Sequence, residues 1–304
     1  MSFALLFSGQ GTQHPAMLPW LIDDGLVHDT CSRLGVDDWR HALADPAWAQ
    51  RNDNAQTLLT GLALAAWNQL APQVASPAAV AGYSVGELAA FSAAGVIDPE
   101  TAAALAAARA QAMDRCAEQA PGGLLAVSGL AESRLERLRL ESGLAIAIRN
   151  GIESVILGGP YAALDVAERM ASLDGAQCTR LRINVASHTP WMREAAESFS
   201  RTLAHVPLHP PQSVLFSNTG ERISDAASAR AALAAQIEST VRWDDCMENV
   251  AARQVTCVLE VGPGQALARI WNQRFPTIPA RACDDFRSSA VIAAWLNSHS
   301  GDPS

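Results

Sequence analysis

Ser84 lies in the pattern GxSxG, Gly82-Tyr83-Ser84-Val85-Gly86, which is typical of a nucleophilic serine. In that motif a tight turn between a strand and a helix presents the hydroxyl, and the glycines let the two elements approach. Here VAGYS favours a strand and VGELAAF favours a helix. The helix start also directs backbone N–H groups towards the serine, where they would stabilise an oxyanion. The pattern predicts covalent acyl chemistry at Ser84, with a structural turn as the alternative.

Two further side chains are candidates for a base and for an anion anchor. His188, in NVASHTP, follows a predicted strand, at a point where a strand end projects into a cleft. The alternative for His188 is a polar capping residue at the surface. Arg109 is the one charge in the apolar helical run AALAAARAQAM. Its planar guanidinium would grip a carboxylate at two points, unless its stem covers the core and its head reaches water.

The charge balance and the types of basic residue exclude several classes of function. The 304 residues include 22 basic and 31 acidic side chains, which gives a formal net charge of -9. That charge argues against a nucleic-acid or anionic-membrane partner, because both require a basic surface. Every basic residue is Arg, which excludes a Schiff base on lysine, a phosphate-loop NTPase and a Ser-Lys dyad. A charged substrate must therefore be bound by local arginines.

The cysteines and the N-terminal segment indicate neither a metal site nor a membrane segment. The six cysteines are scattered without a CxxC pair, so we expect no metal site and no disulfide framework. The opening MSFALLFSGQGTQ has no basic segment before a long apolar stretch. No window contains the roughly 20 apolar residues of a membrane span. We therefore expect a cytoplasmic protein without a bound cofactor.

Alternating extended and helical patterns predict the elements that position these residues. FALLF, at residues 3–7, predicts a buried strand that leads into the glycine-rich turn SGQG, and the residues from there to about 55 are expected to be loop-like. Such alternation is typical of a mostly parallel sheet covered by helices. The predicted class is α/β, with a larger α/β-hydrolase-like domain. Its expected helices cover residues 55–71, 99–119, 190–205, 226–237, 243–253 and a stretch after 264, and its later strands are VLFSN and TCVLEVG.

A change of texture from about residue 124 predicts a second, smaller domain. The strand patterns LLAVSG, LAIAIRN, SVILGG and CTRLRIN alternate with the helical patterns AESRLERLRLE and YAALDVAERMASL. Their order is β-α-β-β-α-β, which is the ferredoxin-like arrangement. We therefore expect residues 123–185 to form an inserted ferredoxin-like (βαββαβ) domain, with residues 1–122 and 186–304 forming the large domain.

Six motifs, in order over nearly the whole chain, resemble those of the malonyl-CoA:acyl-carrier-protein transacylases, a family also built into fatty-acid and polyketide synthases. Six ordered motifs are far more specific than GxSxG alone. Tyr83 departs from the family, since most members have His there, which leaves open the hydrogen bond made beside the serine. The motifs are FSGQGTQ, GYSVGE, the arginine of ARAQAM, NGIESVILGG, VASH before TP, and QIESTVRW followed by EVGPG.

The resemblance implies roles for the residues around the serine. Ser84 would be acylated, and His188 would take its proton and later return it to the leaving thiol. The backbone N–H groups of Gln10 and Val85 would bind the oxyanion. In this family a backbone carbonyl, rather than an aspartate, orients the histidine, and alignment on VRW places that carbonyl at Gln236.

The resemblance also implies how the acyl group is chosen. Arg109 would anchor the malonyl carboxylate, with Met113 one turn further along the helix. Asn150 matches an asparagine near the family's site. For Gln236 and Asn150, simple hydrogen bonding in a loop or at a strand end is the alternative.

The implied activity is transfer of malonyl from malonyl-CoA to the thiol of an acyl carrier protein, by a ping-pong mechanism. The thiol would belong to a phosphopantetheine or CoA-derived arm. Within the family, GYSVGE and the opening MSFALLFSGQGTQHPAMLPWL resemble the epsilon subunit of bacterial malonate decarboxylase. We therefore expect a role in malonate decarboxylation, with the carrier subunit of that enzyme as partner. The alternative is the malonyl transacylase of fatty-acid synthesis.

Two other classes of protein are alternatives to a transferase. An esterase or thioesterase with the α/β-hydrolase fold orders its triad as Ser, acid and His, usually with a late histidine. His299 is late enough, but such a hydrolase has no use for Arg109. A non-catalytic scaffold subunit has no reason to retain Ser84, His188 and Arg109 together.

Overall fold

Strand β1 (Phe3–Phe7) forms the centre of the larger of two sheets in the computed structural model, which describes residues 2–299. All five of its residues are buried. Phe3, Leu5 and Phe7 face one hydrophobic core, whereas Ala4 and Leu6 face another. The uninterrupted apolar run FALLF therefore corresponds to a strand that is covered on both faces.

The larger sheet has the strand order β11-β10-β1-β2-β7-β8. Its neighbouring strands run parallel, except that β8 returns antiparallel to β7. The predicted mixed α/β class is confirmed. Because the carboxyl ends of parallel strands meet at one edge, residues that follow β1, β2 and β7 are brought together there. The other strands are β2 (Ala79–Gly82), β7 (Val214–Phe216), β8 (Arg222–Ile223), β10 (Cys257–Val261) and β11 (Ala280–Ala282).

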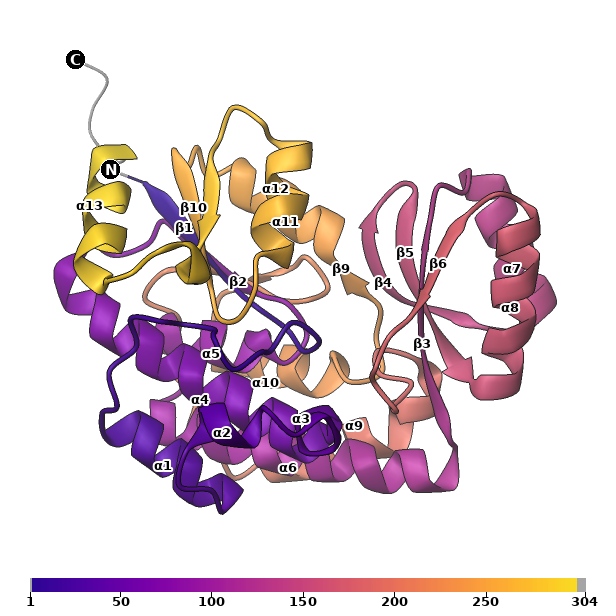
Figure 1. The fold of residues 1–304 in the computed structure, drawn as a ribbon, viewed down its shortest axis with the longest axis horizontal. Coiled ribbons are helices and arrows are strands. Elements are labelled where there is room, and N and C mark those ends of the chain that lie inside the picture. The colour runs from indigo at the N-terminus through magenta and orange to yellow at the C-terminus, as the bar shows by residue number, and fades with distance from the viewer. Residues whose placement is uncertain (1, 300–304) are drawn as a thin grey trace.

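Helices cover both faces of this sheet (Figure 1). They are α1 (Gly25–Leu34), α2 (Trp39–Ala42), α3 (Pro46–Gln50), α4 (Asn52–Leu70), α5 (Gly86–Ala93), α6 (Pro99–Gln119), α9 (Arg193–Leu203), α10 (Ala226–Ala235), α11 (Trp243–Ala251), α12 (Ala266–Arg274) and α13 (Ser289–His299). Buried residues of α11 and α12 pack on the side of Ala4, and those of α1, α4, α5, α6, α9, α10 and α13 pack on the side of Phe3. Within residues 2–299, no helix combines the length and apolarity needed to cross a bilayer.

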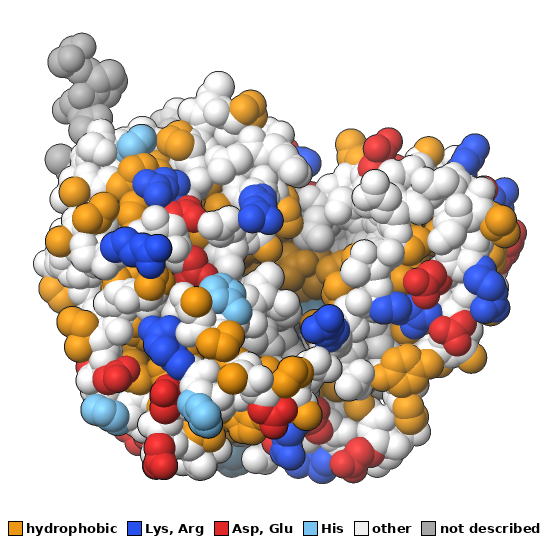
Figure 2. All heavy atoms as spheres, viewed as in Figure 1, with side chains coloured by type: hydrophobic (Ala, Val, Ile, Leu, Met, Phe, Trp, Pro, Cys, Tyr) orange, Lys and Arg blue, Asp and Glu red, His pale blue; other side chains and the backbone are white. Residues whose placement is uncertain are grey.

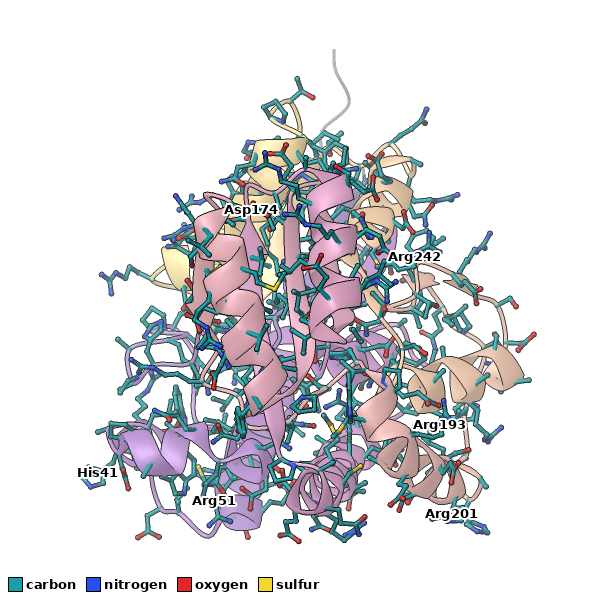
Figure 3. All side chains as sticks on the ribbon, turned by 90° about the vertical axis from the view of Figure 1, so that its right-hand side faces the viewer. His41, Arg51, Asp174, Arg193, Arg201 and Arg242 are labelled. Atoms are coloured by element: carbon teal, nitrogen blue, oxygen red, sulfur yellow. The ribbon has the colours of Figure 1, made fainter. Side chains whose placement is uncertain are left out.

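The smaller sheet has the strand order β6-β3-β5-β4-β9. Helices α7 (Glu132–Ser142) and α8 (Tyr161–Leu173) share a hydrophobic core with one of its faces, and Figure 3 shows them side by side in front of it. The opposite face adds residues to the core that contains α11 and α12. The strands are β3 (Gly122–Ser128), β4 (Ala145–Gly151), β5 (Ser154–Pro160), β6 (Gln177–Arg180) and β9 (Val241–Arg242).

The expectation of a loop between residue 11 and about residue 55 is wrong for three short helices, α1, α2 and α3. An aspartate precedes each of them, and Asp24, Asp38 and Asp45 accept hydrogen bonds from backbone N–H groups of the first turn. None of these helices presents a long periodic apolar stripe. Their ends are stabilised by side-chain caps, and α1 packs on α4, so hydrophobic periodicity is a poor guide to them.

Gly86 lies where α5 crosses the end of β1, and we expect Gly86→Ala to destabilise the fold. A Cβ there would lie 2.4 Å from the Phe7 carbonyl oxygen. Because the obstacle is backbone, helix and strand would have to move apart, at a cost of about 1–3 kcal/mol in the free energy of unfolding, measured in urea. Gly151→Ala is the matched control, since nothing lies within 4 Å of its added Cβ. Equal stability of the two variants would contradict this account of the close approach.

Candidate active site

Ser84 occupies the turn between β2 and α5, as the GxSxG pattern predicts. Its φ of 56° lies in the left-handed region, which costs a residue other than glycine on the order of 1 kcal/mol or more. The Ser84 N–H donates a 2.9 Å hydrogen bond to Oδ1 of Asn218, which follows β7. The turn therefore depends on contacts with a neighbouring strand as well as on its own glycines.

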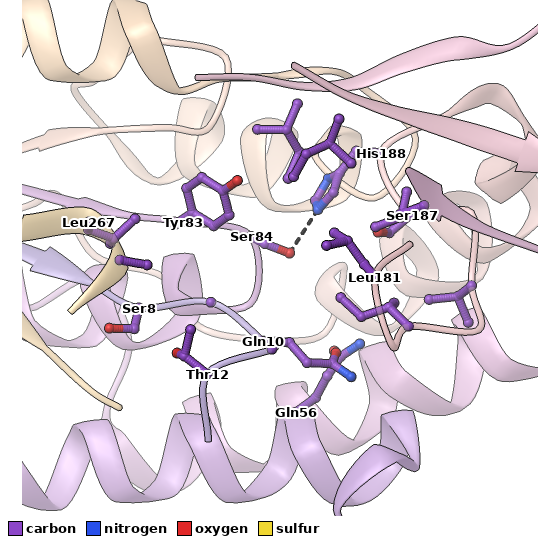
Figure 4. A pocket seen from close by; sticks show the side chains of 18 of the residues that line it. Ser8, Gln10, Thr12, Gln56, Tyr83, Ser84, Leu181, Ser187, His188 and Leu267 are labelled. Atoms are coloured by element: carbon purple, nitrogen blue, oxygen red, sulfur yellow. Dashed lines mark hydrogen bonds between the residues drawn. The ribbon is translucent and has the colours of Figure 1, made fainter. Parts of the chain in front are cut away.

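His188 contacts Ser84, although the two residues are 104 positions apart (Figure 4). The distance from Ser84 Oγ to His188 Nε2 is 2.7 Å, and His188 Nδ1 lies 2.6 Å from the Gln236 carbonyl oxygen. A carbonyl oxygen accepts but never donates, so Nδ1 carries the proton. Nε2 is then the acceptor for the Ser84 hydroxyl, which is the arrangement that general-base activation of a serine requires.

The surroundings of His188 keep its imidazole neutral. Its side chain is buried, and its backbone φ of 61° is also left-handed. Burial, followed by the positive charge of Arg109, lowers the pKa of His188 to about 3, against a smaller opposing effect of the hydrogen bond to Gln236. At neutral pH the ring is therefore free to accept a proton.

Arg109 is 1 % exposed, so the alternative of a head group that reaches water is wrong. Its Nη1 donates to Gln56 Oε1 at 2.6 Å, and its Nη2 donates to Gln236 Oε1 at 3.0 Å. Burial lowers the pKa of Arg109 to about 10, and the nearby charge of Glu87 offsets part of that effect. The guanidinium stays protonated, is held by two neutral amides, and forms no ion pair with any carboxylate in residues 2–299.

Ser84, His188 and Arg109 line a single cavity of about 250 Å³ between the two sheets. Figure 2 shows the hollow between the two parts of the molecule, with hydrophobic side chains visible inside it. Much of the apolar wall comes from the smaller sheet and from α12, through Leu124, Ile148, Ile156, Leu267 and Ile270.

Gln10 and Val85 are the two residues whose N–H groups the resemblance implies for the oxyanion. Gln10 follows β1 and lines the cavity, and Val85 is the residue that precedes α5. The N–H of Ser84 is engaged by Asn218, whereas the N–H groups of Gln10 and Val85 donate to no acceptor in the part of the chain that the structure describes. Both N–H groups are therefore available to an acceptor, which the predicted oxyanion role requires.

Gln236, Asn150 and Met113 take different places around the cavity. Gln236 contacts both His188, through its backbone oxygen, and Arg109, through its side chain. Asn150 accepts a 3.2 Å hydrogen bond from the hydroxyl of Tyr83. Tyr83 is the residue that stands where most members of the resembled family have histidine. Met113 lines the cavity, and its Sδ lies 3.5 Å from the Gln56 amide nitrogen.

Three buried polar residues of the site, Gln56, Glu87 and Asn218, are absent from the sequence-based candidates. Gln56 is a polar residue within the apolar helical run AQTLLTGLALAAW, and Asn218 follows the predicted strand VLFSN. Arg109 likewise lies in an apolar helical run, and His188 likewise follows a predicted strand. The same sequence patterns therefore indicate Gln56 and Asn218 as candidates. Within residues 2–299, no group of three or more His, Cys, Asp or Glu residues is arranged to hold a metal ion.

The fold and this site are those of an acyltransferase, and comparison with known proteins agrees. The chain belongs to the acyl transferase domain family, which matches residues 4–301.

Within this family, the chain is similar to malonyl CoA-acyl carrier protein transacylases. It is 34% identical to that of Mycobacterium tuberculosis (strain H37Rv) over 297 residues, which are 92% of this chain and 95% of the relative. The crystal structure of an acyl-carrier-protein S-malonyltransferase from Burkholderia pseudomallei 1710b superposes with a TM-score of 0.87 at 29% identity, covering 97% of this chain and all of the other. The malonyl-transacylase PlMCAT, solved with the type II PKS acyl-carrier protein AntF, gives a TM-score of 0.89 at 27% identity, covering 98% of this chain and all of the other.

The protonation of His188 is directly measurable, and we expect a neutral ring with the proton on Nδ1 from about pH 8 to about pH 5, a range in which an ordinary histidine titrates. Nitrogen-15 NMR of histidine-labelled protein reports both states, with His188→Gln assigning the resonance. Because the pKa is lower folded than unfolded, stability from burying the neutral ring is present above the unfolded value and decreases as pH falls towards about 3. A midpoint near the ordinary value of about 6.5 would disprove the buried neutral state.

Proposed function

We propose that this protein transfers a malonyl group from malonyl-CoA to the thiol of an acyl carrier protein, through a covalent ester on Ser84. The observation that carries the proposal is the meeting of Ser84, His188 and the unpaired charge of Arg109 in one buried cavity. The similarity to malonyl CoA-acyl carrier protein transacylases over more than nine-tenths of the chain supports it.

The proposed reaction uses the Ser84 hydroxyl as nucleophile. His188 Nε2 takes the hydroxyl proton as Oγ attacks the thioester carbonyl, and the N–H groups of Gln10 and Val85 bind the resulting oxyanion. Collapse of the tetrahedral intermediate breaks the carbon–sulfur bond, and His188 returns the proton to the CoA sulfur. The carrier thiol then repeats these steps in reverse, with the acyl-serine as electrophile. No bound cofactor takes part, and the kinetics are ping-pong.

Arg109 provides the preference for a dicarboxylic acyl group. Its Nε and the side-chain nitrogens of Gln10 and Gln236 are buried without an acceptor in the described part of the chain. Because unpaired buried donors cost roughly 1–3 kcal/mol each, and more when charged, an acceptor-rich ligand is favoured there. A malonyl carboxylate supplies that acceptor and neutralises the guanidinium, whereas an acetyl group does neither.

The metabolic setting has two candidates. The transacylases to which the chain is similar favour an acyl carrier protein with a phosphopantetheine arm, as in fatty-acid synthesis, over our first expectation of malonate decarboxylation. Tyr83, with the motif GYSVGE, is the feature that still favours the epsilon subunit of malonate decarboxylase. Comparing transfer rates to the two carriers, each with its own thiol arm, distinguishes the settings.

The hydrolase alternative has little support. His299 ends α13, where its Nδ1 lies 2.9 Å from the Trp295 carbonyl oxygen, and it does not line the cavity. The residue paired with Ser84 is instead His188, and the orienting group is a carbonyl rather than the acid of a hydrolase triad.

We further propose that residues 123–185 form an inserted ferredoxin-like domain, and that residues 1–122 and 186–304 form the large domain. Support comes from the chain order β3-α7-β4-β5-α8-β6 and from the strand order β6-β3-β5-β4. Strand β3 begins at Gly122, and β9 adds a fifth strand from the large segment.

Intact-mass analysis after mixing with malonyl-CoA tests the nucleophile. We expect the unmodified protein to gain the mass of one malonyl group and Ser84→Ala to gain none, because no other hydroxyl in the cavity is paired with His188. Ser92→Ala, which changes a serine of α5, the helix that follows Ser84, is the control and should be acylated normally. A malonyl adduct that persists in Ser84→Ala would overturn the assignment.

Substitution of Arg109 tests the carboxylate anchor. We expect Arg109→Ala to lower kcat/KM for malonyl-CoA by about 10- to 100-fold, the equivalent of a charged hydrogen bond, while acylation by acetyl-CoA changes far less. Arg109→Lys should recover only part of the loss, because an ammonium does not reproduce the planar fork. Arg115→Ala, an exposed arginine of the same helix, is the matched control. Equal loading of the unmodified protein by malonyl-CoA and acetyl-CoA would refute the anchor.

A further inference from the structure

We infer that Glu87 and Asn218 form a buried positioning pair, which holds the turn of Ser84 in its reactive conformation. This inference rests on the proposed function, because it assigns these residues a role in presenting the nucleophile. Neither side chain lines the cavity, so both act through Ser84 rather than on the substrate. We call the two residues the turn clamp.

Two consecutive hydrogen bonds connect the turn clamp to Ser84. Oε1 of Glu87, in the first turn of α5, accepts a 2.7 Å hydrogen bond from the backbone N–H of Asn218. Oδ1 of Asn218 in turn accepts the N–H of Ser84 at 2.9 Å. Glu87 on α5 thus holds Asn218, which follows β7, and Asn218 in turn holds Ser84.

The rest of Asn218 is fixed as firmly. Its carbonyl oxygen accepts a 2.7 Å hydrogen bond from the N–H of Arg242, and the thiol of Cys246 donates to the carbonyl oxygen of the preceding Ser217. Both Glu87 and Asn218 have 0 % exposure. The backbone around Asn218 is therefore held in place, and its side-chain oxygen accepts the Ser84 N–H.

No other contact accounts for a buried acid at this place. Oε2 of Glu87 and Nδ2 of Asn218 have no hydrogen-bond partner among residues 2–299, and Glu87 forms no ion pair there. Burial raises the pKa of Glu87 to about 7, and the hydrogen bond from the Asn218 N–H and the charge of Arg109 offset part of that rise. Burying a carboxyl group with so few hydrogen-bond partners costs free energy. Stabilisation of the Ser84 turn would explain why an acid occupies this position.

The turn clamp stabilises the backbone conformation of Ser84 that its contact with His188 requires. Its left-handed φ is unfavourable for a serine, and a relaxed turn would move Oγ relative to His188 Nε2. The clamp is therefore expected to affect the rate of acylation more than the binding of malonyl-CoA, because Arg109 keeps its own contacts.

The test is the single-turnover rate of malonyl adduct formation together with the KM for malonyl-CoA. We expect Asn218→Ala to lower the acylation rate by about 10- to 100-fold, as a misplaced reacting group does, with KM changed by no more than about twofold. Asn272→Ala, which also removes hydrogen bonds from an asparagine side chain to the backbone, is the matched control for lost stability and should keep the normal rate.

A charge swap tests the pair directly. Asn218→Asp keeps an oxygen for the Ser84 N–H but places a second carboxylate beside Glu87, so the acylation rate should fall. Adding Glu87→Gln restores one acid and one amide, and the double variant should regain most of the rate. Glu87→Gln alone keeps an acceptor for the Asn218 N–H and should change the rate by less than about threefold.

The outcomes separate this inference from the proposed function. If Asn218→Ala acylates at the normal rate, or if the double variant is no faster than Asn218→Asp, the turn clamp is disproved while the nucleophile assignment stands. If the unmodified protein forms no adduct at Ser84, the proposed function fails and the inference fails with it. Should Asn218→Ala not fold, the comparison of the single and double swap variants decides the matter.

Discussion

The contact on which the site depends is the close approach of α5 to the ends of β1 and β2. Glycine at 82 and 86 allows this approach, since a Cβ at Gly82 would lie 2.2 Å from the Gly86 carbonyl oxygen. The approach bends the chain so sharply that Ser84 takes a left-handed conformation. Local strain of this kind persists only where the surroundings hold it, and here the segment that follows the neighbouring strand β7 supplies the holding residue, Asn218.

Gln236 contacts both His188 and Arg109. Its carbonyl oxygen fixes the tautomer of His188, and its side-chain oxygen holds one arm of Arg109. The same residue thus sets the orientation of the His188 ring and the position of the Arg109 guanidinium, which we propose binds the substrate carboxylate. The neighbouring Ile237 carbonyl also accepts the backbone N–H of His188. A single short segment before β9 therefore organises groups that come from distant parts of the sequence.

The sequence predicts the elements far better than it predicts the contacts between them. The α6 helix has the expected limits, 99–119, because its Asp98 cap and Pro99 define its start and its apolar pattern is long. The meeting of positions 84, 109 and 188 follows from the family resemblance rather than from periodicity. The contacts of Gln56 and Asn218 cannot be predicted from local patterns, since their partners are 53 and 134 positions away. Local patterns carry no information about such pairings, nor about β9, a strand of two residues.

Strand β9 has a consequence for how the cavity can change size. The smaller sheet is joined to the larger unit by the covalent connections at its two ends and also by β9, which pairs with β4 at Ile148 and Arg149. Thr240 adds a 2.7 Å hydrogen bond to the Ile146 carbonyl oxygen. Figure 1 shows β9 bridging the two units. Moving the smaller sheet away from the larger one would require breaking these hydrogen bonds, so β9 opposes any widening of the cavity.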